Sequence, residues 1–377
     1  MDLELSDDEA ALASTAAEVL AGVCPPSLVR AVFEGKDDGG EVWNQLVALD
    51  WPALGIAEEH GGLGMGFVEL AVVAEQLGRA VVPGPFLATA TQYAPAVRAL
   101  GDAAAQSRLL PPVARGEVTG TLAVAEAGRW DLDAVAARAE PAGDGWRLIG
   151  RKEAVLHGAS VDELVVVARG DAGLGAFAVP RAAVQIDERE VIDPTMPLAD
   201  VVLAGVDVPA DRVLAPPGSD CDEAVRRVLD EATVALAVAT VGTCRRIFEM
   251  TLEYAKERVQ YDRPIGSFQA LKHRLADMYL AVERAASVGW YAALTIAEDD
   301  PRRREAASQA KAAASDCQDL LVKEGLQLHG GIGMTWEHDL HFFLKRAKLG
   351  DAIFGSGAHH RSQLASMLGL LPVGVTA

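Results

Sequence analysis

The spacing of hydrophobic positions changes twice along the chain. Near the start, apolar residues recur every three or four positions, the period of a helix with one buried face: Leu12, Ala16, Val19, Leu20 and Val23. Ser6 and Glu9 before them form the pattern of a capping box, and Pro25-Pro26 ends the helix. The same reasoning predicts further helices over residues 42–49, 67–77 and 103–113. We interpret the glycine-rich segment 59–66 as a connector, because no strand precedes it.

From about residue 121 the pattern becomes short, β-rich and punctuated by Gly, Pro and Asp. Five such stretches predict strands, at 122–125, 146–149, 164–168, 175–179 and 201–203. Regular short strands of this kind indicate a small barrel or sandwich.

After Pro216-Pro217-Gly218 the helical period returns. Phe248, Leu252 and Ala255 share one face, and Asp300-Pro301 has the composition of a helix start. A long apolar face then ends at Gly330-Gly331. The chain is therefore expected to be a multidomain α+β protein, with a helical domain at 1–120, a β-barrel-like domain at 121–217 and a helical bundle at 218–377.

Composition narrows the classes of function. The 377 residues include 34 Lys and Arg against 54 Asp and Glu, a net charge of −20, so we expect neither a nucleic-acid partner nor attraction to anionic membranes. Four separated cysteines without a CxxC pair predict no disulfide framework or zinc site and fit a reducing cytoplasm. The first residues show no signal-peptide pattern.

Two segments carry candidate chemistry, at 257–269 and at 327–334. Taken alone, each has an ordinary explanation, since an arginine before Pro-Ile-Gly or a Gly-Gly pair can simply end a helix. The alternative is a ligand close to the glycine backbone, where a Cβ would interfere. Arg258 offers a forked cation for phosphate oxygens and Gln327 an amide for an adenine.

Together with the helix–β–helix order, these segments resemble the acyl-CoA dehydrogenase family, over nearly the whole chain and most strongly from residue 228. The resemblance implies an N-terminal helical domain, a middle β domain and a C-terminal four-helix bundle, usually in a tetramer. It implies FAD as cofactor, oxidation of the Cα–Cβ bond of an acyl-CoA thioester, and an electron-transfer flavoprotein as acceptor.

The resemblance also assigns residues. The family's arginine-x-x-phenylalanine motif is similar to Arg258 and Tyr261, and its glutamine–glycine-glycine motif is similar to Gln327, Gly330 and Gly331. With a glutamine resembling Gln269, these residues reach across a subunit interface in the family and hold the ADP half of the neighbour's FAD.

The segments that serve a subunit's own flavin depart from the family pattern. The loop that resembles Thr-Glu-Pro-x-x-Gly-Ser-Asp is 125–131 and lacks the family's hydroxyls and proline. In the stretch that resembles Lys-x-Trp-Ile-Thr-Asn-Gly, Ala154 replaces the tryptophan and Leu156 the threonine. Phe354 occupies the usual position of the catalytic glutamate, and Ala232 occupies its other known position. Glu231 is the remaining candidate base. It lies one position before Ala232, and on a helix a shift of one position turns the side chain to another face.

These departures lead to three hypotheses. The chain takes part in acyl-CoA dehydrogenation, as one subunit of a heterotetramer whose partner supplies the base and the flavin-ring site, or as a homotetramer. Alternatively it is a non-catalytic scaffold that completes a partner's FAD site, or an oxidase-like member that acts alone. No metal is expected, because His338 and His341 lack a specified third ligand.

Overall fold

In this computed structural model, residues 5–218 and 220–370 are described. Their contacts divide the chain into two compact units. The helical unit comprises residues 1–37, 67–82 and 233–377, and the sheet unit comprises residues 38–66 and 83–232. The predicted absence of a signal peptide falls partly on residues 1–4, which lie outside the described part.

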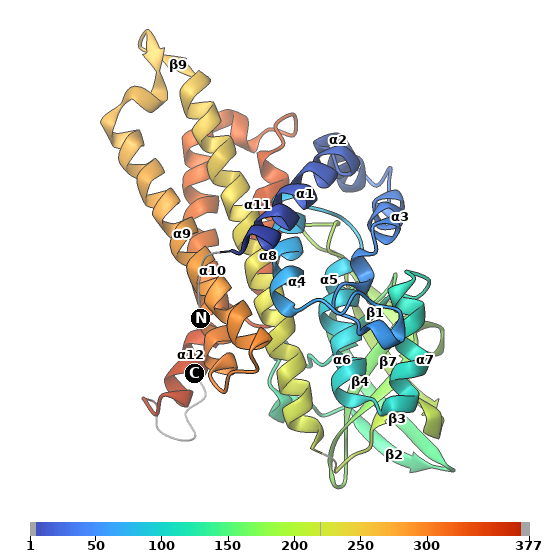
Figure 1. The fold of residues 1–377 in the computed structure, drawn as a ribbon. Helices are drawn as coiled ribbons and strands as arrows, with labels where there is room; N and C mark the ends of the chain where they lie inside the picture. The colour runs from blue at the N-terminus through green and yellow to red at the C-terminus, as the bar shows by residue number, and fades with distance from the viewer. Residues whose placement is uncertain (1–4, 219, 371–377) are drawn as a thin grey trace. The chain divides into compact units, whose positions relative to one another are not determined.

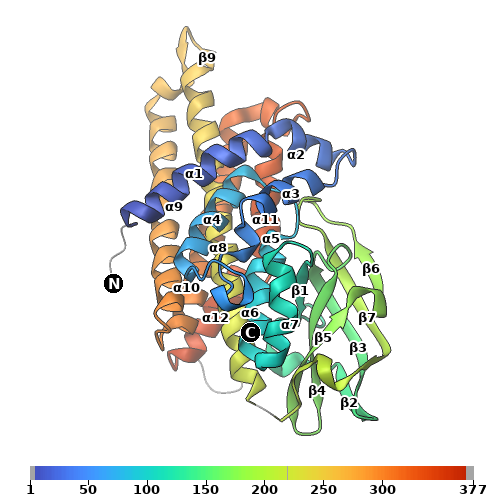
Figure 2. The same cartoon turned by 45° about the vertical axis from the view of Figure 1, so that its right-hand side comes forward.

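The helical unit contains seven of the helices in the described ranges, drawn in Figures 1 and 2. They are α1 (Asp7–Val23), α2 (Pro26–Phe33), α4 (Phe67–Ala80), α9 (Gln269–Ala297), α10 (Arg303–His329), α11 (Leu340–Ala352) and α12 (Gly357–Met367). The long α8 (Cys221–Glu257) begins in the sheet unit and continues into this one. A short hairpin, β9 (Val259–Gln260) and β10 (Arg263–Pro264), joins α8 to α9.

Small side chains set how closely these helices approach. A Cβ added at Gly78 of α4 would lie 1.8 Å from the carbonyl oxygen of Ala239, and one at Gly242 would lie 2.1 Å from that of Glu75. The backbones of α4 and α8 therefore meet where only glycine fits. Buried alanines such as Ala235, Ala306 and Ala310 continue this pattern in the bundle.

The sheet unit contains α3 (Gly40–Ala48), α5 (Phe86–Ala88), α6 (Ala94–Leu100) and α7 (Ala103–Ala114), with a π-helical turn over Thr89–Tyr93. Three further single turns are 3-10 helical, at Trp51–Ala53, Glu58–His60 and Leu132–Ala134, and two more are at Arg181–Ala183 and Ala210–Arg212. The strands are β1 (Gly120–Ala123), β2 (Arg138–Ala142), β3 (Gly145–Leu156), β4 (Glu163–Gly170), β5 (Gly173–Pro180), β6 (Gln185–Arg189), β7 (Leu198–Val208) and β8 (Val213–Ala215).

Within the described residues these eight strands form one sheet in the order β6-β7-β3-β2-β4-β5-β8, and β1 pairs with β4 in parallel. Side chains alternate between its faces. Leu164 and Val166 of β4 join Phe177 and Leu203 in a core between strands, which gives the sheet its barrel-like interior. Val165 of the same strand faces a second core, shared with α6, α7 and the start of α8.

Most predicted elements are present, with differences at their ends. The Ser6 hydroxyl and the Glu9 carboxylate form both hydrogen bonds of the capping box, as predicted. The helix start predicted at Asp300-Pro301 lies two residues too early, because α10 begins at Arg303. The Asp300 carboxylate instead accepts hydrogen bonds from the backbone N–H and guanidinium of Arg302, and so does not cap the helix.

No single described helix is long and apolar enough to cross a membrane. Within the described ranges, one bent pair, α1 with α2 at 58°, passes that test of length and composition.

Candidate functional site

The β9–β10 hairpin presents the first candidate segment. The backbone carbonyl of Arg258, directly after α8, accepts a hydrogen bond from Ile265 N–H at 2.8 Å and closes the hairpin. Tyr261 and Asp262 at its tip have φ values of 51° and 60°, the left-handed pair that a tight hairpin turn needs. The Tyr261 side chain is 86% exposed, and its ring meets Phe268 edge-on. The turn thus projects from the helical unit into solvent (Figure 1).

The second segment ends α10. Gly330 has φ 62°, and its N–H caps the last turn by donating to the Gln327 carbonyl. A Cβ added at Gly330 or Gly331 would meet nothing within 4 Å. The space over these glycines is therefore open to a ligand or a neighbouring molecule, as the close approach of a ligand requires.

The buried His329 side chain holds this turn in place. Its Nδ1 lies 2.8 Å from the Gly325 carbonyl oxygen, and its ring stacks on Tyr254 of α8 with centroids 4.6 Å apart. Burial lowers the pKa of His329, so the ring is neutral at physiological pH. The stacking joins the end of α10 to the last turns of α8, and it brings the two candidate segments to the same end of the helical unit.

A second set of contacts holds the residues that follow the glycines. The Arg30 guanidinium of α2 donates to the Trp336 carbonyl and pairs with the Asp339 carboxylate, each at 2.5 Å. The Trp336 indole N–H donates to Glu34 at 3.1 Å, and the indole stacks on His341. Arg30 and Glu34 therefore position the segment between the glycine turn and α11.

We name the exposed set of six residues on these segments the Arg258 surface: Arg258, Tyr261, Gln269, Gln327, Gly330 and Gly331. The Gln269 amide lies 3.3 Å from His273, whereas Arg258 and Gln327 have no side-chain partner in the described part of the chain. An unpaired guanidinium and two amides are donors suited to a phosphate and an adenine, and the open glycines leave space beside them. The residues present thus fit the ADP half of a dinucleotide.

The loop that would face the chain's own flavin is built differently. The Glu126 carboxylate pairs with the fully buried Lys152 ammonium at 2.5 Å and also accepts from the N–H groups of Ala136 and Ala137. Backbone hydrogen bonds between Glu126 and Arg129 close a tight turn. Burial lowers the pKa of Lys152 to about 8, against the opposing effect of Glu126. The loop is fixed by an internal ion pair and carries no hydroxyl.

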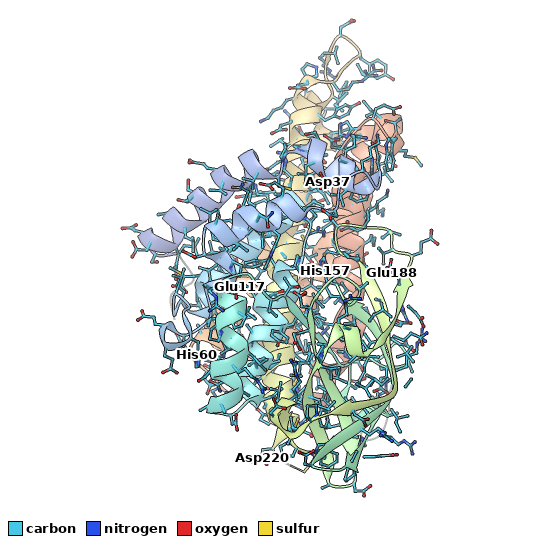
Figure 3. All side chains as sticks on the ribbon, turned by 90° about the vertical axis from the view of Figure 1, so that its right-hand side faces the viewer. Asp37, His60, Glu117, His157, Glu188 and Asp220 are labelled. Atoms are coloured by element: carbon cyan, nitrogen blue, oxygen red, sulfur yellow. The ribbon has the colours of Figure 1, made fainter. Side chains whose placement is uncertain are left out.

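The second segment expected to face the chain's own flavin, around Ala154 and Leu156, also makes its contacts within the sheet unit. Ala154 has φ 49°, and its N–H donates to Asp200 at 3.0 Å. Leu156 is buried, and His157 lies next to it, at the end of the unit away from Asp220 (Figure 3). The His157 Nδ1 lies 3.2 Å from Ser160 Oγ. Neither the aromatic ring nor the hydroxyl of the family pattern is present, so these residues do not fit a flavin ring.

The candidate base positions carry no free carboxylate. Phe354 is 4% exposed with φ 61°, and Ala232 is 1% exposed. The Glu231 carboxylate accepts two hydrogen bonds from Arg98, at 2.7 and 2.8 Å. In this structure Glu231 is one half of an ion pair in which a single Arg98 nitrogen, Nη2, contacts both carboxylate oxygens.

The two histidines weighed as metal ligands, His338 and His341, do not lie on one helix. His338 precedes α11, where its Nδ1 accepts from Leu340 N–H, while His341 lies inside the helix. No cluster of three ligating side chains occurs among the described residues.

Comparison with known proteins identifies the family. Residues 6–117 match the model of the acyl-CoA dehydrogenase N-terminal domain, and residues 223–369 match that of the C-terminal domain. The chain is 32% identical to acyl-CoA dehydrogenase IpdE2 of Mycobacterium tuberculosis, over 89% of each protein.

Two solved structures extend the likeness to the fold. The ChsE4-ChsE5 complex of Mycobacterium tuberculosis superposes with a TM-score of 0.89 at 26% identity, covering 99% of this chain and 100% of that one. A variant of the Tcur3481-Tcur3483 steroid ACAD gives 0.87 at 30% identity, covering 97% and 98%. The expected helical, β and helical architecture is thereby confirmed, and the chain belongs to the acyl-CoA dehydrogenase family of FAD-dependent oxidoreductases.

Proposed function

We propose that this chain is one subunit of a heterotetrameric acyl-CoA dehydrogenase, in which a second, different subunit carries the catalytic base and the flavin-ring site. The observation that carries the proposal is Phe354. This residue stands where the family places its glutamate, and a phenyl group cannot accept the α-proton of the substrate. Bound FAD would supply the hydride acceptor for the β-carbon.

The contribution of this chain is the Arg258 surface. Arg258 would bind the pyrophosphate oxygens of the partner's cofactor through its forked guanidinium, and Gln269 and Gln327 would offer amides to the adenosine end. Gly330 and Gly331 leave room for the cofactor to approach the backbone, since a Cβ there would project into this space. Tyr261 extends the hairpin toward the neighbouring subunit.

The relatives support a partner of the same family. Two similar structures are named for two components each, and one of them is described as a steroid ACAD. We therefore propose a second acyl-CoA dehydrogenase subunit as partner, an electron-transfer flavoprotein as acceptor, and steroid side-chain CoA thioesters as the first substrates to test, with fatty acyl-CoA thioesters as comparison.

Glu231 carries the second candidate function, a homotetramer that acts alone. Its carboxylate would first have to leave the Arg98 guanidinium, at the cost of two charge-assisted hydrogen bonds. A Glu231→Gln variant separates the two candidates. The heterotetramer should keep kcat within about twofold, whereas a base at Glu231 requires a loss on the order of 10²-fold or more.

The proposed cofactor role is tested by Arg258→Ala in the co-expressed complex, with Arg263→Ala as the matched control on the same hairpin. The Arg263 guanidinium lies over the Phe268 ring at 4.1 Å and is not part of the Arg258 surface. We expect the affinity for FAD to fall on the order of tenfold or more in Arg258→Ala, because the variant loses a charged hydrogen bond. The affinity of the Arg263→Ala control should stay unchanged. Equal flavin content in both variants would contradict the role of Arg258.

A further inference from the structure

A half-open cavity of about 350 Å³ lies at the surface of the helical unit, between α1, α2, α4, α8 and α11. Figure 2 shows α1 and α2 lying across the other helices of this unit. The volume falls in the range of small-molecule sites, about 300–1,000 Å³. No residue of the Arg258 surface lines it.

Most of the wall is apolar. Leu20, Val29 and Phe343 are buried side chains of the lining, and Ala17 and Ala21 leave space on α1. Cys24 adds to this apolar wall: its thiol hydrogen-bonds to the Ala80 carbonyl, and burial raises its pKa to about 11. The thiol is therefore protonated and unreactive at neutral pH.

The polar lining residues come from α4 and α8. Gln76 and Arg79 are three positions apart on α4 and so share a face, and Arg246 projects from α8. Arg79 Nη2 lies 2.8 Å from the Glu249 carboxylate, and Arg246 Nη1 lies 3.4 Å from it. Glu253 is 3.7 Å from Arg246, but its side chain is 61% exposed.

The two guanidiniums keep N–H donors that these carboxylates do not use. Arg79 uses Nη2 toward Glu249, and Arg246 uses Nη1 toward both Glu249 and Glu253, although a guanidinium has five N–H donors. A carboxylate brought by a ligand can accept hydrogen bonds from the remaining N–H groups. The Gln76 amide has no hydrogen-bond partner among the described residues and can donate to the same group.

We propose that this cavity binds a medium-chain aliphatic carboxylate, with its tail among the apolar side chains and its carboxylate at Arg79 and Arg246. A cavity of 150 Å³ holds benzene, so about 350 Å³ accommodates roughly a dozen non-hydrogen atoms, the size of decanoate. The inference does not depend on the proposed heterotetramer, since every lining residue belongs to this chain.

The test is calorimetric titration of the full chain with decanoate and with 1-decanol. Ala17→Phe fills the cavity, while Ala11→Phe places the same ring on the exposed face of α1 as a control. We expect saturable decanoate binding that Ala17→Phe weakens at least tenfold and Ala11→Phe changes less than twofold. Ala21→Phe serves as a second filling variant if Ala17→Phe lowers the melting temperature.

The head-group contact is tested by Arg246→Leu. It should weaken decanoate binding on the order of tenfold and leave decanol binding within about twofold, because only the carboxylate uses the guanidinium. The proposal is overturned if decanoate does not saturate, or if the filling variants bind it as tightly as the control does. Equal losses for decanoate and decanol in Arg246→Leu would overturn the assignment of the carboxylate to the arginines.

Discussion

The imidazole Nε2 of His360 lies 2.9 Å from the backbone carbonyl oxygen of Phe354, and the other ring nitrogen lies 3.2 Å from the Ser308 hydroxyl. The main chain at Phe354 is therefore anchored to α10 and α12, in a left-handed conformation that is costly for a bulky residue. Gly355 has φ 95°, a conformation that favours glycine, and a Cβ there would also lie 2.4 Å from the His359 ring. The backbone of the segment is fixed, while its side chain is a buried phenyl group.

A phenyl group in this place stabilises the fold and takes no part in proton transfer. Phe354→Ala should lower the free energy of unfolding by ~3–5 kcal/mol, the cost of truncating a buried phenylalanine. The kcat of the assembled complex should stay within about twofold at a temperature where the variant is folded. Phe354→Leu, which keeps most of the volume, is the control. A selective loss of kcat at unchanged stability would instead indicate a catalytic role.

The buried pair of Glu126 and Lys152 should tolerate loss of both charges better than loss of one. Glu126→Gln leaves the Lys152 ammonium buried without its carboxylate, and we expect a loss of ~3–5 kcal/mol in urea denaturation. Adding Lys152→Met should recover much of that loss. Glu117→Gln breaks a fully exposed pair with Arg115 and should leave the denaturation midpoint nearly unchanged. If the effects of the two substitutions on the free energy of unfolding simply add in the double variant, the pairing is contradicted.

Lys311 makes stability depend on pH. Its buried ammonium donates to the carbonyls of Gly350 and Asp351 at the end of α11, and burial lowers its pKa to about 8. Between pH 8 and the ordinary lysine pKa of about 10.5, the unfolded chain binds more protons than the folded one, so stability rises with pH. Below pH 8 both states are protonated, and the burial cost is fully present.

The stability difference between wild type and Lys311→Met isolates this effect. It should shift in favour of wild type by up to ~3 kcal/mol from pH 8 to 10.5. Urea denaturation at several pH values measures it, and a difference that stays flat over this range would contradict the assignment.

Features that depend on neighbouring residues in the sequence were predicted better than features that depend on tertiary contacts. The Ser6 capping box and the stop at Gly330 were predictable, because a cap depends on residues within one turn. The start of α10 was predicted too early, because the Asp300 carboxylate accepts a hydrogen bond from the Arg302 N–H and does not cap the helix. The strands β2, β6 and β8 were not predicted. The first two are short and polar without a clear alternation, and β8 is an apolar stretch of three residues, so all three depend on pairing with neighbours.

The two buried lysines were also missed. Lys152 pairs with Glu126, which is 26 positions away in the sequence. Lys311 donates to carbonyls at the end of α11, about 40 positions away. No local pattern specifies such partners. The only available signal was a lysine within an otherwise apolar stripe, as at Lys311 among the alanines of α10. The site residues came from the family resemblance, and their roles remain predictions.

The central claim is that this chain completes a FAD site whose base and ring pocket belong to another subunit. The most direct measurement is flavin absorbance together with acyl-CoA-dependent reduction of an artificial electron acceptor, for the chain purified alone and after co-expression with a candidate partner dehydrogenase. We predict a colourless, inactive chain alone and a yellow, active heterotetramer with the partner. A yellow, active homotetramer of this chain alone would contradict the account.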